Sequence, residues 1–327
     1  MTKILELKNV EIGYSDKSLI KDINASIEQG EFVILLAKNG QGKSTLSETV
    51  LGIKSPILGT INLANQDLKH ISLQERAEIM SAVFSKLHFV PTIKVKELIE
   101  LGRLPHQQKY NFIDHTDKTF IDEIIKFVEI ESFIDSYADE LSEGQLQLVM
   151  IARALIQDTP FLILDEPTAN LDIENQIKIF KLIKKINREK QKSILFITHE
   201  AQLALQFADK IWWIENQKLV EGFPEDLSFD FKILHQLSGG QLIYDLKSDN
   251  YQLNLNQFDK QSNVLSELKY WIKHAMIRLS INYEPSLLEE IHLEKNTIRF
   301  RDQHFDRIEA LVKYIQEHEK YYYNRSK

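Results

Sequence analysis

The stretch from residue 37 to residue 45 constrains this chain more than any other. It comes directly after a short apolar run, Phe32 to Leu36. Its sequence is Ala37-Lys38-Asn39-Gly40-Gln41-Gly42-Lys43-Ser44-Thr45. A buried strand that leads through a glycine-rich turn into a helix directs backbone N–H groups into one concavity, with the positive end of the helix dipole behind them. The pattern therefore predicts a phosphate-binding loop.

Two side chains of this loop have predicted roles in nucleotide chemistry. We expect Lys43 to reach the β- and γ-phosphates, and the Ser44 hydroxyl to bind Mg²⁺. Ala37 stands at the first position of the pattern, where glycine is usual, and we interpret it as a tolerated departure because Gly42 and the two residues after it are intact. Further nucleotide contacts are predicted for Asn39, Gly40, Gln41, Gly42 and Thr45.

Composition limits the classes of protein to consider. The chain has 327 residues, of which 43% are hydrophobic, enough for one large domain and a smaller one. A net charge of −8 argues against a nucleic-acid-binding surface. Residues 1–230 carry 26 Lys and Arg against 35 Asp and Glu, whereas residues 231–327 carry 14 against 13, so we predict a domain boundary near 230. The absence of cysteine excludes disulfides and thiolate chemistry.

The sequence predicts no membrane-spanning segment. Residues Thr2 to Glu6 alternate like a strand and lack the apolar core of a signal peptide. No apolar run approaches the length of about 20 residues that a membrane helix needs. We therefore expect any membrane role to depend on a partner protein.

Acidic and imidazole side chains follow two further buried strands. Phe161 to Leu164 leads into Asp165 and Glu166, and Ser193 to Ile197 leads into Thr198 and His199. Carboxylates at the carboxyl edge of a parallel sheet lie where ligands bind and offer the oxygens that a hard cation needs. We predict that Asp165 holds Mg²⁺ through water, that Glu166 polarises the attacking water, and that His199 contacts the γ-phosphate.

The residues after 230 predict a small α+β domain. Strand-like segments, 241–246 and 251–255, flank a turn composition at 247–250. An amphipathic helix is expected over 264–279, then a hairpin over 291–293 and 297–301, then a second amphipathic helix through Phe305, Ile308, Leu311, Val312 and Ile315. This ββα order occurs twice and suggests a weak repeat.

Taken together, the motifs resemble the nucleotide-binding subunit of an ATP-binding cassette (ABC) transporter over residues 3–222. The matching stretches, in order, are AKNGQGKST, LSEGQ at 141–145, FLILDEPTANLD at 161–172 and ITHE at 197–200. The resemblance implies an α/β P-loop NTPase: a RecA-like core with an antiparallel β-subdomain and an α-helical subdomain at about 86–158. The predicted domains are thus an ABC ATPase domain at 1–230 and an accessory α+β domain at 231–327.

The resemblance also implies roles for individual residues. Tyr14 matches the aromatic residue that stacks on adenine, although its position alone leaves packing open. Asp165, Glu166 and His199 match the Mg²⁺ acid, the general base and the switch histidine. Asp172 matches an acid that communicates across a head-to-tail dimer. Each ATP would lie between Lys43 of one chain and a second set of residues on the other, namely Ser142, Gly144 and Gln145.

Three positions depart from the family pattern. Glu143 and Ala169 stand where Gly and Ser are usual. Ser85 stands where a glutamine that senses Mg²⁺ is expected; its hydroxyl can ligate the metal, or it can be a turn serine. A second stretch, Leu237-Ser238-Gly239-Gly240-Gln241, matches the family signature better than 141–145 does. We interpret it as a coincidence because it follows His199 and precedes a hairpin.

A looser match points to a substrate class. Residues Val95 to His106 resemble the helical subdomain of importers for iron–siderophore complexes, heme or cobalamin. We therefore expect an ATPase that uses ATP and Mg²⁺ and is peripheral to the cytoplasmic face of the inner membrane. It would drive import of a metal chelate through separate permease subunits, with an external binding protein and no nucleic acid. Two alternatives stay open, a soluble ABC-type ATPase not coupled to transport and an ATP-binding regulator with little turnover.

Overall fold

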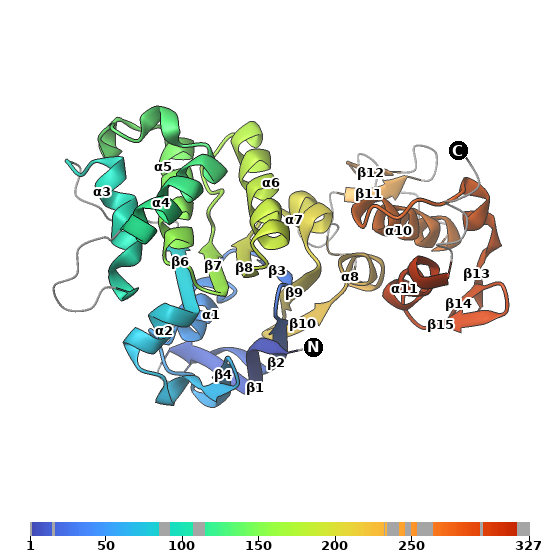
Figure 1. Cartoon of the computed structure of the whole chain (residues 1–327). Coiled ribbons are helices and arrows are strands. Elements are labelled where there is room, and N and C mark those ends of the chain that lie inside the picture. Colours follow the sequence, from blue (N-terminus) through green and yellow to red (C-terminus); the bar gives the residue numbers. More distant parts are fainter. Residues whose placement is uncertain are drawn as a thin grey trace. The chain divides into compact units, whose positions relative to one another are not determined.

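The computed structural model describes two compact units of the chain (Figure 1). Unit 1 contains residues 1–204 and 208–221, and unit 2 contains residues 205–207 and 222–327. The described residues are 2–14, 17–84, 92–106, 115–231, 233, 242–245, 250–253, 264–294 and 297–318. The predictions for Ser85 and for the stretch 237–241 fall outside them. Within the described residues, no helix combines the length and the apolar character that crossing a membrane requires.

Unit 1 is built on a six-stranded sheet with the order β10-β9-β3-β8-β7-β6. The strands are β3 (Phe32–Ala37), β6 (Met80–Phe84), β7 (Phe161–Asp165), β8 (Ser193–Thr198), β9 (Lys210–Glu215) and β10 (Lys218–Gly222). Strand β3 pairs in parallel with β8 and β9, and β7 pairs in parallel with β6 and β8. Every residue of β3 and β8 is buried, as expected for strands covered on both faces.

A second, antiparallel sheet in unit 1 has the order β2-β1-β4-β5. It consists of β1 (Lys3–Tyr14), β2 (Lys17–Glu28), β4 (Leu58–Leu63) and β5 (Gln66–Asp67). One hydrophobic core connects it to the six-stranded sheet, since Leu5 and Ile23 share a cluster with Leu35 and Ile163. This sheet matches the antiparallel β-subdomain that the family resemblance implies.

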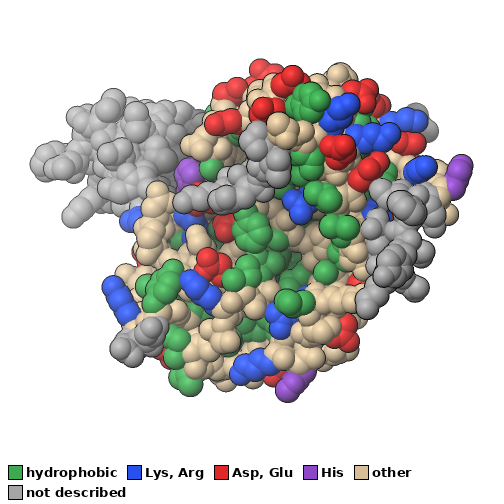
Figure 2. All heavy atoms as spheres, turned by 90° about the vertical axis from the view of Figure 1, so that its left-hand side faces the viewer, with side chains coloured by type: hydrophobic (Ala, Val, Ile, Leu, Met, Phe, Trp, Pro, Cys, Tyr) green, Lys and Arg blue, Asp and Glu red, His purple; other side chains and the backbone are tan. Residues whose placement is uncertain are grey.

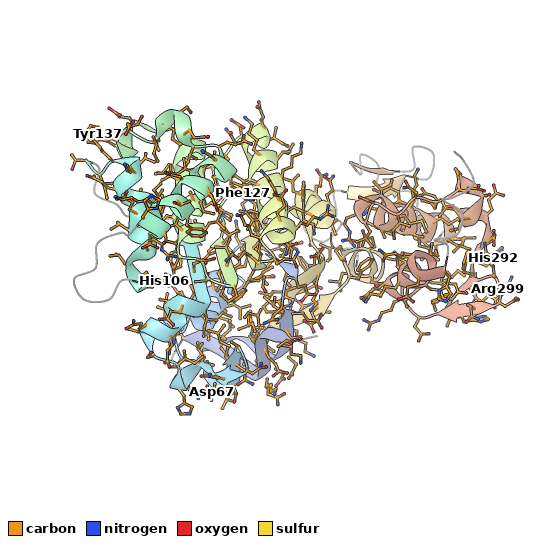
Figure 3. The ribbon with its side chains drawn as sticks, viewed as in Figure 1. Asp67, His106, Phe127, Tyr137, His292 and Arg299 are labelled. Atoms are coloured by element: carbon orange, nitrogen blue, oxygen red, sulfur yellow. The ribbon has the colours of Figure 1, made fainter. Side chains whose placement is uncertain are left out.

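Helices make up most of the remainder of unit 1. They are α1 (Lys43–Val50), η1 (Leu68–His70), α2 (Leu73–Ile79), α3 (Val95–Glu100), η2 (Leu101–His106), α4 (His115–Val128), η3 (Glu131–Phe133), η4 (Ala138–Glu140), α5 (Glu143–Ile156), α6 (Ile173–Glu189) and α7 (Ala201–Phe207). A hydrogen bond of 2.7 Å joins the His106 ring, at the end of η2, to the Gln157 carbonyl after α5 (Figure 3). The Gln157 amide in turn donates to the carbonyl of Ala77 in α2. The family resemblance implied a helical subdomain at about 86–158, and the described residues of this range are mostly helical, from α3 to α5.

Unit 2 combines helices with two small sheets. Its elements are α8 (Pro224–Phe231), β11 (Leu242–Asp245), β12 (Asn250–Leu253), α10 (Val264–Arg278), η5 (Pro285–Glu290), β13 (Ile291–Glu294), β14 (Thr297–Phe300), β15 (Gln303–Phe305) and α11 (Ile308–His318). In the pair β13–β14, Ile291 and Phe300 are cross-strand partners that face the core, whereas His292 and Arg299 are partners on the other face (Figure 3).

Two predictions for unit 2 need correction. Phe305 lies in a third strand, not in the last helix, because Arg301 adopts φ 54° and the chain turns back to pair β15 with β14. The second ββα segment therefore contains an extra strand, and the suggested repeat does not hold. The units also divide between Glu221 and Gly222, not at 230, because α8 packs on α10 and α11.

Candidate functional site

The predicted phosphate loop and acids meet at one edge of the six-stranded sheet. Strands β3, β7 and β8 run parallel, with β8 between the other two. Their carboxyl ends lead into the loop after Ala37, the pair Asp165–Glu166 and the segment Thr198–His199. Residues that are more than 120 positions apart in sequence are thereby placed at the same edge. This is the position where open α/β sheets bind ligands.

Lys43 is held inside the loop by oxygen atoms. The residue is only 6% exposed, so its ammonium needs partners within the protein. Its Nζ donates to the Ala37 carbonyl at 3.0 Å and to the Asn39 side-chain oxygen at 3.3 Å. The same Nζ lies 3.4 Å from Oε1 of Glu166. The structure thus brings together the predicted lysine and the predicted general base.

The backbone of the loop is shaped to bind an anion. Gly40 has φ 78° and Gly42 has φ 97°, values that favour glycine. Gly42 is the N-cap of α1 and provides no side chain to accept the first N–H groups of the helix. These N–H groups and the positive end of the helix dipole are therefore available for phosphate oxygens. Ser44, in the first turn of α1, is exposed at this end of the helix.

The two adjacent acids differ in environment. Burial raises the pKa of the Asp165 carboxyl, and the negative charge of Glu166 raises it further. Glu166 has φ 49°, a left-handed conformation that is uncommon for a residue with a side chain. Its N–H donates to the Ile197 carbonyl at 2.9 Å, which fixes the backbone of the acid pair to the end of β8. Such constrained backbone is frequent at functional sites.

The residues present fit a magnesium ion. The hydroxyl of Ser44 and the carboxylate of Asp165 are hard oxygen donors, and a nearby cation would offset the unfavourable burial of Asp165. Among the described residues, no group of three or more His, Cys, Asp or Glu could by itself hold a metal ion. Mg²⁺ usually keeps waters and phosphate oxygens as most of its ligands, so two protein oxygens are enough to hold it beside a phosphate.

His199 lies after β8, with its side chain about half exposed. Its Nε2 is 3.3 Å from Oε1 of Glu200, and the same carboxylate oxygen accepts a long hydrogen bond of 3.4 Å from the Gln176 amide. No hydrogen bond or ion pair in the described part of the chain links His199 to Lys43 or Glu166. Glu200 was not among the predicted residues, and its only signal in the sequence was that it directly follows His199.

Ser142 is engaged within its own helix. Its hydroxyl accepts the N–H of Gln145 at 3.3 Å, and the side chain of Gln145 accepts the N–H of Ser142 at 3.0 Å. This reciprocal capping box defines the start of α5. Glu143 is exposed in the first turn, where its charge is favourable to the helix dipole. Across the described ranges, no hydrogen bond connects Ser142 to the phosphate loop of the same chain.

Asp172 and Gly144 are connected by a residue that the sequence analysis missed. Asp172 caps α6 by accepting the N–H of Asn175 at 2.8 Å, and the Asn175 amide donates to the other carboxylate oxygen at 3.0 Å. A Cβ on Gly144 would lie 3.2 Å from the Asn175 side chain, so the two residues approach closely and a larger residue would require Asn175 to shift. The signal available from sequence was only that Asn175 stands three positions after a helix cap.

Tyr14 lies at the end of β1 and keeps 55% of its surface exposed, which leaves ring area for a ligand. Its hydroxyl accepts a hydrogen bond of 3.1 Å from Thr45, one of the predicted loop residues. Lys54, which lies over the ring, and its ion-pair partner Glu48 were not predicted. Neither belongs to a motif, so the sequence contained no signal for them.

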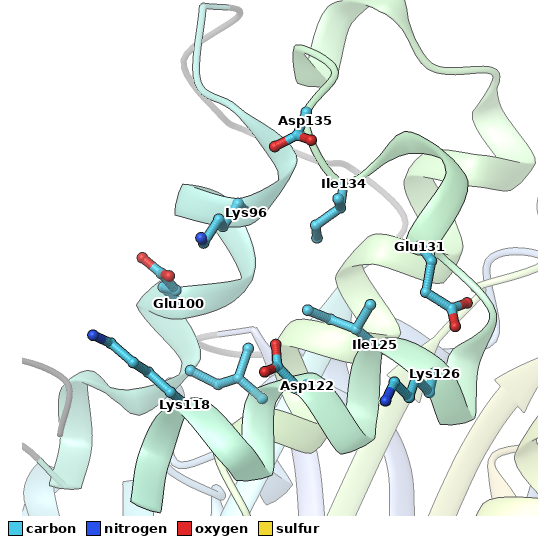
Figure 4. Close-up of a pocket in the computed structure, with 10 residues that line it drawn as sticks. Lys96, Glu100, Lys118, Asp122, Ile125, Lys126, Glu131, Ile134 and Asp135 are labelled. Carbon is cyan, nitrogen blue, oxygen red and sulfur yellow. The ribbon is translucent and has the colours of Figure 1, made fainter. Parts of the chain in front are cut away.

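A separate pocket lies in the helical part of unit 1 (Figure 4). Its volume is about 450 Å³, and its floor contains Ile121, Ile125 and Ile134. Charged side chains from α3, α4 and the segment after it surround this floor, among them Lys96, Asp122 and others shown in Figure 4. None of the predicted nucleotide-binding residues lines this pocket, so we do not assign the candidate site to it.

Comparisons with known proteins agree with this geometry. The family described as ABC transporter matches residues 20–169. The chain is 30% identical over 225 residues to the petrobactin import ATP-binding protein YclP of Bacillus subtilis (strain 168), covering 68% of this chain and 88% of that protein. It is 31% identical over 204 residues to the iron(3+)-hydroxamate import ATP-binding protein FhuC of the same organism, covering 62% and 76%.

A solved structure extends the comparison to three dimensions. It is a dimeric ATP-binding cassette in a post-hydrolysis state, bound to ADP and Pi. This chain matches it with a TM-score of 0.58 at 28% identity, over 67% of this chain and 98% of that one. The predicted α/β P-loop fold is therefore confirmed.

Proposed function

The chain belongs to the ATP-binding proteins of ABC transporters and is an ATPase, and from this premise we propose that it energises the import of a metal chelate. The proposed chelates are of the iron–siderophore, heme or cobalamin type. Support comes from two relatives at 30% and 31% identity that are named for import of petrobactin and of iron(3+)-hydroxamate. The predicted resemblance to this family is thus confirmed, and the substrate class is the finer proposal.

The observation that supports the ATP-hydrolysis part of the proposal is the proximity of Lys43 to Glu166 at the start of α1. Their side chains are 3.4 Å apart at the edge where Asp165 also lies. In the proposed mechanism, the first-turn N–H groups and Lys43 bind the phosphates of ATP and neutralise their charge. Mg²⁺, when bound by Ser44 and Asp165, would supply further charge neutralisation at the phosphates.

Glu166 orients the water for attack on the γ-phosphate in this mechanism. Its carboxylate accepts a hydrogen bond from the water and takes its proton as the new P–O bond forms and the bond to ADP breaks. Because Lys43 is bonded to the backbone of its own loop, the charged groups are positioned before the substrate binds, and little reorganisation is needed. His199 contacts the γ-phosphate from the end of β8.

We assign the remaining predicted residues to a head-to-tail dimer. Among the described residues, Ser142, Gly144 and Gln145 form no hydrogen bond with the phosphate loop of their own chain, and in the proposed dimer they would contact ATP bound to a second copy. A relative of known structure is a dimeric cassette bound to ADP and Pi. Asp172, joined to Gly144 through Asn175, would then lie beside the same interface.

An exposed apolar surface is the proposed docking site for the permease. Leu73 at the start of α2 is 82% exposed, and Leu104 in η2 is 56% exposed, although leucine is normally buried. Helices α2 and η2 are in contact, and Phe84 at the end of β6 is also exposed. Figure 2 shows hydrophobic side chains gathered across the middle of this face. Docking there would place the chain at the cytoplasmic face of the inner membrane, with an external binding protein delivering the chelate.

Uptake measurements in cells test the proposal directly. The native chain and the Glu166→Gln variant would be compared in cells that lack the gene, with radiolabelled ferric siderophore, heme and cobalamin as separate probes. We expect the native chain to restore uptake of one of these probes and the variant to restore none. If cells that lack the gene still take up all three probes, the proposed substrate class is rejected. Active ATP hydrolysis by the purified chain without any permease copurifying would favour a soluble ATPase.

A further inference from the structure

The ring of Tyr14 is connected to the helix that carries the phosphate loop. Thr45 and Glu48 both lie on α1, which begins at Lys43. Thr45 donates its hydroxyl hydrogen bond to the Tyr14 oxygen at 3.1 Å. Together with the charge of Lys54, this hydrogen bond lowers the pKa of the Tyr14 hydroxyl. The aromatic side chain at the end of β1 therefore has a fixed reference point on α1.

Lys54 covers one face of this ring. Its ammonium lies 4.2 Å from the ring centroid, within the range of a cation–π interaction. The same ammonium is 2.6 Å from Oε2 of Glu48, so the lysine is held from two sides. Its backbone is fixed as well, because the N–H of Lys54 donates to the Glu48 carbonyl at 3.1 Å. A side chain with this many restraints differs from a freely moving surface lysine.

The loop that carries Lys54 is also bonded to the strand that carries Tyr14. The N–H of Ile57 donates to the Glu11 carbonyl on β1 at 2.8 Å. A shift of this loop would therefore move Lys54 and the end of β1 together. An aromatic ring has two faces, and a cation on one face leaves the other available for stacking.

We propose that Lys54, held by Glu48, positions Tyr14 so that the free face of its ring stacks on the purine base of the nucleotide. Lys54 is thus a positioning residue for the base and takes no part in phosphate chemistry. This inference rests on the proposed nucleotide site and adds a residue to it. It identifies the base, separate from the phosphates, as the part of the ligand that Lys54 influences.

Binding measurements with two probes test this assignment. ATP carries base and phosphates, whereas tripolyphosphate carries phosphates alone. In Lys54→Met, which keeps a long unbranched stem but removes the charge, we expect the Kd for ATP to rise about five-fold. The Kd for tripolyphosphate should not change. Lys8→Met is the matched control. Lys8 is an exposed lysine on β1, the strand that carries Tyr14, and it pairs with an acid, Glu6, as Lys54 does. This change should alter neither Kd.

A double variant separates positioning of the ring from a general effect of charge. In a Tyr14→Ala background, Lys54→Met should no longer alter the Kd for ATP, since no ring remains to be positioned. The inference would be overturned if Lys54→Met weakened the binding of ATP and of tripolyphosphate equally. It would also be overturned if the variant bound ATP more tightly, because Lys54 would then cover the ring face that the base needs. If the native chain binds neither probe, the proposed function itself fails.

Discussion

Each unit of this protein contains a pair of adjacent acids next to a proline, and the two pairs have opposite surroundings. In unit 1, Asp165 and Glu166 lie at an open sheet edge, where the only basic group in an ion pair with them within the described ranges is Lys43 at 3.4 Å. In unit 2, Glu225 and Asp226 lie in α8 and are 0% and 7% exposed. The first pair has carboxylate oxygens available for a ligand, and the second does not.

Glu225 and Asp226, the adjacent acids of unit 2, both accept hydrogen bonds from residues inside the protein. Glu225 accepts hydrogen bonds from His274 at 2.8 Å and from two nitrogens of Arg278 at 2.8 and 2.9 Å. Burial alone would raise the pKa of Glu225, but these partners outweigh it and lower the pKa. Asp226 accepts the first N–H groups of α11, from Ile308 at 2.6 Å and Glu309 at 3.1 Å. The two adjacent acid pairs thus differ in their surroundings: internal hydrogen-bond partners engage the pair in unit 2, whereas the pair in unit 1 lies at the edge proposed to bind ATP.

The units also differ in a second way, because each contains a copy of the signature pattern, LSEGQ at 141–145 and LSGGQ at 237–241. The largest effect is expected from changing the serine of each copy, Ser142 or Ser238. Ser142→Arg should abolish ATP-driven dimerisation, because it places bulk and charge at the proposed ATP sandwich. Ser238→Arg should leave ATPase activity nearly unchanged. Size-exclusion chromatography with ATP and a phosphate-release assay measure the two effects. Loss of activity from the Ser238 change alone would assign the signature to unit 2.

The next largest effect should come from the acid pair of unit 1. Glu166→Gln keeps the shape of the side chain but removes the group that polarises water, so hydrolysis should slow by on the order of 10²-fold or more. ATP binding should persist, and the variant should accumulate as an ATP-bound dimer. Near-native turnover in a single-turnover assay would remove Glu166 from the mechanism.

The corresponding change in unit 2 should affect stability and leave catalysis intact. Glu225→Ala leaves Arg278 and His274 without their buried carboxylate, which should cost about 3–5 kcal/mol. Hydrogen exchange of α10 and α11 measures this loss, while ATP hydrolysis should be unchanged. Glu290→Ala is the control, because the Glu290–Arg301 pair is exposed and should contribute at most about 1 kcal/mol. Equal exchange in both variants would contradict a structural role for Glu225.

A smaller, pH-dependent effect is expected at Asp226. Burial raises its pKa to about 6, with the charges of Asp230 and Glu309 adding to the rise. The folded state therefore binds the proton more tightly than the unfolded state, so the stability of unit 2 should fall as pH rises from about 4 to about 6. The decrease should be at most about 3 kcal/mol. Denaturant unfolding at several pH values measures this decrease, which should be missing in Asp226→Asn. An unchanged decrease in the variant would assign the pH dependence to other groups.

The smallest effect on nucleotide binding should come from removing most of unit 2. We propose that unit 2 is a separable accessory domain, regulatory or supporting the dimer, since every residue assigned to ATP chemistry lies before position 200. A chain that ends at Glu221 should bind ATP with a Kd within about two-fold of the full chain, because the partners of the site are retained. A folded truncation that cannot bind ATP would place part of unit 2 in the active site.

Local sequence patterns were sufficient for the phosphate loop and the strands of the six-stranded sheet. Phe32 to Leu36 and Phe161 to Leu164 are continuous apolar runs, and such runs indicate strands buried on both faces. The glycines of the loop indicate a turn with positive φ, which Gly40 and Gly42 adopt. These features could be predicted because each depends on neighbouring residues.

Only the tertiary structure decided the contacts between distant segments. Helix α8 belongs to unit 2 because Glu225 and Asp226 bond to residues about 50 and 80 positions later, which charge counts along the chain could not show. Lys54 lies over Tyr14, and Asn175 lies against Gly144, although no motif contains either pair. Periodicity and composition encode burial and turns, whereas the pairing of particular side chains depends on how the elements pack. For this reason the sequence alone could predict Asp165 and Glu166 as acids of an ATP site, but the structure was needed to show that Glu225 and Asp226, the adjacent acids of unit 2, have internal partners.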